Sequence, residues 1–237
     1  MRSLRVLSRL LVYPNAENFA QLDDLKHVLK EDGFLKTKTL KNLSVFIDEL
    51  NGMDMMDAQE AYVALFDRGR AHCLHLFEHV HGESRFRGQA MVDLSDRYAE
   101  KGLVIGVGEL PDYLPVFLEF ISICEPEEGL ETLAQAAPVI ATIGEKLKRQ
   151  KSGYASVFKA IVELSGAKLS KKDIAKAADA ALPDIQTLDE LDEEWQEPEA
   201  FGGSADCDTG CSPNFANQMP LTRASQPAGK PTNLGAN

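Results

Sequence analysis

The stretch Tyr62–Leu94, YVALFDRGRAHCLHLFEHVHGESRFRGQAMVDL, contains four of the five histidines of this 237-residue chain. Its apolar side chains recur every three or four residues, which is the spacing of one face of an α-helix. We therefore predict one long helix over Met55–His81, ended by Gly82 as a C-terminal cap, and a further helix over Ser84–Lys101. Helical periodicity in this stretch makes an all-α fold the expected class.

A helical wheel of this stretch separates an apolar face from a narrow polar stripe of Arg68, His72, His75 and His79. Three interpretations of the stripe are open. It is the polar flank of a core helix; or it is a recognition surface, on which side-chain donors orient a docked protein segment beside apolar residues; or it is a metal site. The last is suggested by His75-Leu-Phe-Glu78-His79, which matches the H-x-x-E-H pattern of zinc-dependent hydrolases. Arg68 opposes the metal site, because its cation would repel a divalent ion.

The rest of the chain shows the same periodicity and little strand-like alternation. Further helices are predicted over residues 2–12, 17–31, 39–50, 112–124, 126–149 and 154–164. Pro138 is expected to interrupt the helix over 126–149, because proline lacks the amide donor of a helix interior. We predict one compact helical domain over 1–166, a weakly helical acidic extension over 167–197 and a disordered tail over 198–237.

Charge and composition limit the function. The formal net charge is −12, and ten acidic against two basic residues lie between Asp184 and the C-terminus. This balance argues against nucleic acid or an anionic membrane as the main partner. The chain has no run of about 18 apolar residues that could span a bilayer. Its four cysteines do not form a disulfide framework, and we take Cys207 and Cys211 as a chance pair. A cytoplasmic protein is expected.

The stretch Tyr62–Leu94 resembles the signature region of the NarJ family, the nitrate reductase molybdenum cofactor assembly chaperones. The resemblance lies in YVxLFDRGR, LHLFEHVHGESR and RGQAMVDL; Cys73 and Phe86 depart from the pattern. A second block, Glu109-Leu-Pro-Asp-Tyr-Leu-Pro115, is similar to a segment of the wider group of redox-enzyme maturation chaperones. The resemblance covers roughly residues 4–165.

This resemblance implies a helical bundle of the molybdoenzyme-chaperone type and a protein client in place of a substrate. The client would be the apo form of the catalytic (alpha) subunit of respiratory nitrate reductase, bound through its N-terminal segment. The chaperone would keep it competent for molybdenum cofactor insertion before membrane attachment, with no metal or cofactor of its own. Proteins that deliver the molybdenum cofactor are further expected partners.

From the residue pattern and this resemblance together we expect a client-binding site built from one set of side chains. Tyr62, Leu65, Phe66 and Phe77 would shape an apolar groove, although Tyr62 and Phe66 also suit plain core packing. Polar members would orient the client, and a loop would adjust between the free and bound states. The polar members are Arg70, His75, His79 and Glu83, and the loop residues are Asp112 and Tyr113.

Two other classes compete with a chaperone. A zinc hydrolase would use His75, Glu78 and His79, and metal analysis of the purified protein would detect it. A permanent subunit of a helical assembly would co-purify with the finished enzyme.

Overall fold

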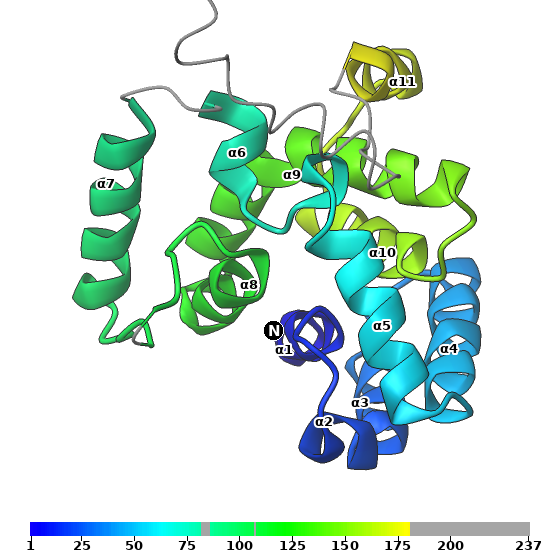
Figure 1. Ribbon diagram of the computed structural model, residues 1–237. Helices are drawn as coiled ribbons and strands as arrows, with labels where there is room; N and C mark the ends of the chain where they lie inside the picture. Colours follow the sequence, from blue (N-terminus) through cyan, green and yellow to red (C-terminus); the bar gives the residue numbers. More distant parts are fainter. Residues whose placement is uncertain (82–85, 107, 181–237) are drawn as a thin grey trace, which may run out of the picture. The chain divides into compact units, whose positions relative to one another are not determined.

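The computed structural model describes residues 1–81, 86–106 and 108–180, and these residues form helices without a β-strand (Figure 1). The predicted all-α class is confirmed. The elements are α1 (Arg2–Leu10), α2 (Ala16–Ala20), α3 (Leu22–Asp32), α4 (Thr37–Asn51), α5 (Met55–Phe66), the 3₁₀ helix η1 (Arg70–His72), α6 (Leu76–His81), α7 (Phe86–Glu100), α8 (Leu114–Ile123), α9 (Pro126–Arg149), α10 (Ala155–Ser165) and α11 (Lys171–Ala180). Among them, none is long and apolar enough to cross a membrane.

The first helix lies at the centre of the core. α1 packs against α3, α8 and α10 (Figure 1). Its leucines at helical spacing, Leu4 and Leu7, are fully buried, as is Leu11 directly after the helix. Burial of each such side chain contributes about 1.5–3 kcal/mol, so the amphipathic pattern of residues 2–12 explains the position of this helix.

A carboxylate from another helix caps α1. Asp32, at the end of α3, accepts hydrogen bonds from the backbone amide and the hydroxyl of Ser3 at 2.8 and 2.6 Å, and from Arg2 Nε at 3.2 Å. Burial raises the pKa of Asp32, but the hydrogen bonds from Ser3 and the charge of Arg2 outweigh it, and the net pKa is lowered from 3.8. An anion at a helix N-terminus is stabilising, and this one also ties α3 to α1.

Two predicted helices differ from the structure in ways that local packing explains. The helix expected over residues 17–31 is divided at Gln21 into α2 and α3, because Asn15 caps α2 and the Gln21 amide bonds to Asn18 O at 3.2 Å. The predicted interruption of α9 at Pro138 is wrong, since the helix continues through it. Pro138 is exposed, so the ring occupies solvent while the opposite face of α9 packs against α8 and α10.

The predicted long helix over Met55–His81 is wrong. α5 ends at Phe66, η1 follows, and the chain is extended at Gly69 and Cys73 before α6 begins. Backbone groups of this segment form hydrogen bonds with residues far along the chain instead of within a helix. Leu76 N donates to Asp112 O at 3.0 Å, and Leu114 N donates to Leu74 O at 2.8 Å. Residues 68–79 therefore do not share one helix, and the predicted polar stripe does not exist as a helix face.

The helices predicted over 39–50, 112–124 and 154–164 correspond to α4, α8 and α10. The predicted acidic extension begins near α11, which packs against α9. Its remainder and the predicted disordered tail lie outside the described residues, so the domain boundaries at 166 and 197 stay predictions.

Candidate functional site

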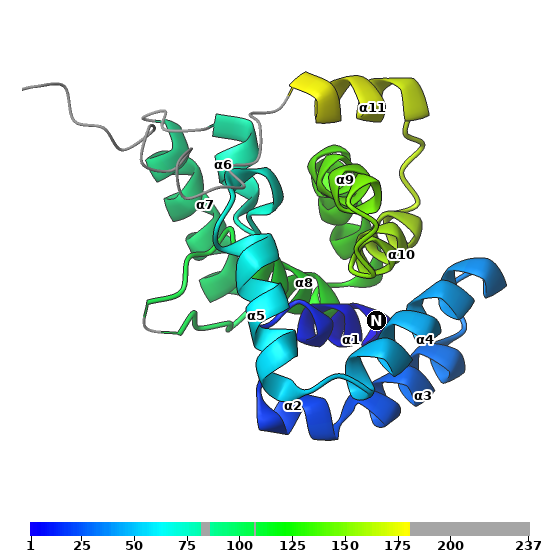
Figure 2. The ribbon, with the colours of Figure 1, turned by 45° about the vertical axis from the view of Figure 1, so that its right-hand side comes forward.

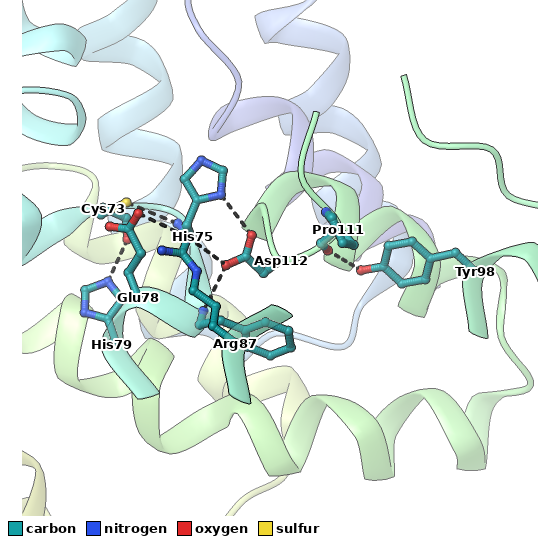
Figure 3. Close-up of polar contacts among 9 residues, drawn as sticks. Cys73, His75, Glu78, His79, Arg87, Tyr98, Pro111 and Asp112 are labelled. Carbon is teal, nitrogen blue, oxygen red and sulfur yellow. Dashed lines mark hydrogen bonds and ion pairs between the residues drawn. The ribbon is translucent and has the colours of Figure 1, made fainter. Parts of the chain in front are cut away.

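Two segments far apart in the sequence meet in a corner that contains much of the predicted site (Figure 3). One is the extended chain before α6 together with α6 itself, and the other is the loop before α8. The two backbones form an isolated antiparallel bridge between His75 and Tyr113. We call residues 73–79 and 111–113 the corner.

Asp112 holds the corner together. Its side chain is fully buried, and its two carboxylate oxygens have different partners. Oδ1 accepts from His75 Nδ1 at 3.0 Å, and Oδ2 accepts from the backbone amide of Phe77 at 3.1 Å (Figure 3). Arg87 Nη2 lies 3.8 Å from Oδ2 and completes the charge compensation. Because Phe77 lies in the first turn of α6, Asp112 acts as an N-terminal cap supplied from another part of the chain.

The remaining polar side chains of the corner are engaged within the protein. His79 Nε2 donates to the carbonyl of Cys73 at 2.8 Å, and Arg87 donates to Glu78 at 3.2 Å. Burial, and to a smaller extent the charge of Lys146, lowers the pKa of His79 from 6.5. The surroundings of His79 therefore favour its neutral form, and Nε2 already has a partner within the protein.

Cys73 is unsuited to nucleophilic chemistry. Burial, together with the carboxylate of Glu78, raises the pKa of its thiol to about 12. A thiol with such a pKa is protonated at neutral pH, whereas the thiolate is the nucleophile.

An aromatic cluster lies beneath the corner. The Tyr62 ring packs against Phe66 with centroids 4.9 Å apart, and Phe66 packs against Tyr154 at 4.9 Å. The Tyr62 hydroxyl donates to Leu11 O at 2.8 Å and lies 3.3 Å from the Tyr113 hydroxyl. Tyr62 and Phe66 are only 3% and 4% exposed. Both are core residues, and Tyr62 contacts Tyr113 through its hydroxyl, so a client cannot reach either ring without rearrangement.

The other predicted residues are distributed more widely. Leu65 is half-buried and lines a small cavity of about 260 Å³ with Met53 of the α4–α5 loop. Arg70 is exposed on η1, and Phe77 is half-buried on α6. The structure therefore brings His75, Phe77, His79, Asp112 and Tyr113 together, with Tyr62 below. Glu83 lies outside the described residues.

Three residues that contact the corner or the η1 turn directly before it were not predicted. Arg87 of α7 contacts both Glu78 and Asp112, and it lies within the stretch that resembles the family signature. The buried Tyr98 donates its hydroxyl to Pro111 O at 2.7 Å, and Lys146 donates to Ala71 O at 3.0 Å. No spacing in the sequence indicates the last two contacts, because they join separate elements.

The H-x-x-E-H pattern does not form a metal site in the described part of the chain. His75 precedes α6 and faces Asp112, His79 faces a backbone carbonyl, and Glu78 faces Arg87. Among the described residues no group of three or more histidine, cysteine or acidic side chains is arranged to hold an ion. The zinc-hydrolase alternative has no geometric support there.

Comparison with known proteins agrees with the signature. The family described as nitrate reductase delta subunit matches residues 20–160. The nitrate reductase molybdenum cofactor assembly chaperone NarJ of Escherichia coli K12 is 40% identical over 198 residues, which cover 83% of each chain. The probable chaperone NarW of the same strain is 36% identical over 219 residues, covering 92% of this chain and 90% of its own. The probable NarJ of Bacillus subtilis is 30% identical over 152 residues, or 64% of this chain and 82% of its own.

Proposed function

This chain belongs to the nitrate reductase delta subunit family, within the group that includes the NarJ assembly chaperones, and we propose that it binds the N-terminal segment of an apo nitrate reductase catalytic subunit. The family is one of cofactor-assembly chaperones, so the chain is a chaperone and not an enzyme. In our proposal it acts in the cytoplasm, keeps the client competent for molybdenum cofactor insertion, and releases it before membrane attachment. The client, and not the chaperone, receives the cofactor, and proteins that deliver it are proposed as further partners.

The observation that supports a binding site at the corner is its preformed surface. His75 is 29% exposed although its other side is fixed by the fully buried Asp112. Phe77 and Tyr113 are half-buried beside it, and Arg70 is exposed on η1. The His75 donor thus lies next to apolar groups and is already held in place by Asp112, which reduces the entropy lost on binding.

We assign different roles to these residues. Phe77 and Tyr113 would contact apolar side chains of the client, while Arg70 and His75 would donate to its backbone or charged groups. Asp112 is a positioning residue, because it is buried and acts through His75 and the start of α6. Tyr62, Leu65 and Phe66 would act as support, and His79 and Glu83 remain proposed members of the site.

The expected affinity is moderate. A client helix that buries three or four large apolar side chains gains about 1.5–3 kcal/mol for each. Association and ordering cost about 4–15 kcal/mol, so the net stabilisation is small enough to permit release.

Calorimetry against a synthetic peptide of roughly the first 15 residues of the catalytic subunit, long enough for about four helical turns, tests the proposal. We expect saturable one-to-one binding that weakens about tenfold or more in His75→Ala and in Arg70→Ala, which corresponds to about 1.4 kcal/mol. Arg68→Ala is the matched control, because Arg68 is also exposed but is outside the proposed site.

Two results would contradict parts of the proposal. Parent-like affinity of both His75→Ala and Arg70→Ala would remove their orienting role, and absence of peptide binding by the parent would remove the N-terminal segment as the client. Stable co-purification with the finished, cofactor-loaded enzyme would instead favour a permanent subunit.

A further inference from the structure

A second surface lies away from the corner, in a groove of about 810 Å³ between α4, α9, α10 and α11. Figure 2 shows α11 beside α9, with α4 packed against α10 from below. We call this the α4–α11 groove. The proposed binding of the client at the corner does not involve this groove.

The α4–α11 groove is strongly basic. Of the described residues that line it, five are lysines and two are glutamates. One glutamate, Glu145, is paired with Lys148 at 2.9 Å. Four of the lysines come from different elements around the groove, so a ligand in the groove has positive charge on several sides: Lys38, Lys151, Lys159 and Lys171. In a protein of net charge −12 this concentration of positive charge is unusual, and it fits an acidic ligand.

The groove also has apolar walls. Val45 of α4 is 49% exposed although it lies beside the core residue Phe46. Val162 of α10 and Ile174 of α11 are half-buried in the same lining. A fitting ligand therefore combines apolar side chains on one side with acidic groups along its edges.

The sequence that follows α11 has this composition. Between residues 184 and 199 the chain contains eight acidic residues and no lysine or arginine. Its apolar residues recur every three or four positions, as on one face of a helix: Leu182, Ile185, Leu188, Leu191 and Trp195.

The first turn of α11 lines the groove, and an ion pair holds the end of this helix against α9. Lys171 and Ile174 of α11 are part of the lining. Asp179 forms an ion pair with Arg149 at the end of α9, with Nη1 and Oδ1 2.6 Å apart. Arg149 adjoins Lys148, which lines the groove, so the end of α11 lies near the rim of the groove. A local segment also has a high effective concentration at such a site.

We propose that residues 182–195 bind in the α4–α11 groove of their own chain as an acidic amphipathic segment. Leu188, Leu191 and Trp195 contact the apolar walls, and the acidic side chains pair with the lysines of the rim. The segment thereby covers the apolar walls of the groove and compensates the positive charge of its rim.

Trp195 reports on this binding in the full-length protein, because it is the single tryptophan of the chain. We expect blue-shifted emission and a low acrylamide quenching constant in the parent. Quenching should increase by about twofold or more, toward that of the free peptide 182–199, when Lys148 and Lys159 are both changed to glutamate. Raising the salt concentration should have the same direction of effect in the parent, because the lysines are exposed to screening.

Control variants separate binding from folding. Lys41→Glu makes the same charge change on an exposed position of α4 outside the groove and should leave the fluorescence unchanged. Val45→Asp alters an exposed wall residue, and Leu188→Asp alters the segment without touching the described core; both should increase quenching while helicity and the thermal midpoint stay at parental values.

Three outcomes overturn the proposal. The first is red-shifted Trp195 emission in the parent, with an acrylamide quenching constant equal to that of the free peptide. The second is a protected Trp195 that is insensitive to the groove variants, which places the segment elsewhere. The third is protection that is lost on dilution, which assigns the groove to the segment of a second copy. Client-peptide affinity, measured in parallel, tests the corner independently.

Discussion

Replacement of Asp112 by alanine is the strongest single perturbation of the corner. The carboxylate is fully buried and accepts from the Phe77 amide at 3.1 Å and from His75 Nδ1 at 3.0 Å. Arg87 Nη2, 3.8 Å away, compensates its charge. Alanine leaves all three donors in place without their acceptor, which is costlier than replacing donor and acceptor together.

The magnitude follows from the exposure of each donor. His75 is 29% exposed, so water can replace much of its lost hydrogen bond. The Phe77 amide lies in the first turn of α6 and donates to the fully buried Asp112, and a hydrogen bond to a charged acceptor contributes about 1.5–3 kcal/mol. With the weakened Arg87 ion pair, we expect Asp112→Ala to lower the free energy of unfolding by about 2–4 kcal/mol. Asp112→Asn keeps one acceptor oxygen and should lose about 1–2 kcal/mol.

Urea unfolding followed by far-ultraviolet circular dichroism measures the global effect, and hydrogen exchange of residues 76–80 measures the local one. Glu109→Gln removes an exposed carboxylate from the same loop and should change stability by no more than about 0.5 kcal/mol. A loss below about 0.5 kcal/mol in Asp112→Ala, with unchanged exchange at the start of α6, would refute the capping role.

Three further predictions concern stability. Asp32→Asn should lower the free energy of unfolding by about 1–2 kcal/mol near pH 7. Because the pKa of Asp32 is lowered from 3.8 in the folded protein, the parent should lose this advantage as the pH falls from 3.8 through the lowered pKa. Urea unfolding midpoints of both proteins at neutral and acid pH measure this difference. His79→Gln should reduce the acid sensitivity of the thermal midpoint below pH 6.5, because the unfolded parent takes up a proton that the folded state, with a lowered histidine pKa, does not. Gly153→Ala would place a methyl group against the ring of Phe46 and should cost about 1–3 kcal/mol, whereas Gly88→Ala in α7 meets no atom within 4 Å and should gain about 0.4–1 kcal/mol, both measured by urea unfolding.

Each has an opposing result. Parallel pH profiles for Asp32→Asn and the parent would show that the α1 cap is not linked to proton uptake. An unchanged acid slope in His79→Gln, with the exposed His27→Gln as control, would assign the sensitivity to another group. Equal effects of the two glycine substitutions would contradict the packing of Phe46.

Local sequence determined most of the helices and their buried faces. The leucines of residues 2–12 recur at helical spacing, and the structure buries them at the centre of the core. Gly33, with φ of 68°, ends α3 close to the predicted helix end at residue 31, because glycine adopts the left-handed conformation without a steric penalty. The signature over residues 62–94 identified the family, since a long specific string carries information that periodicity does not.

Tertiary structure decided the break between α5 and α6 and the identity of the corner. Residues 67–75 have helical spacing, yet their backbone is helical only in η1, because Leu74 and Leu76 pair with a loop almost 40 residues later. That pairing places the buried Asp112 beside the start of α6. Its carbonyl accepts from the Leu76 amide, which would bond within the helix if the helix continued. The predicted polar stripe was wrong for this reason, while two of its four members, His75 and His79, still meet in the corner. Periodicity reports which side chains can share a face, but a hydrogen bond to a distant carboxylate becomes available only when the whole chain has folded.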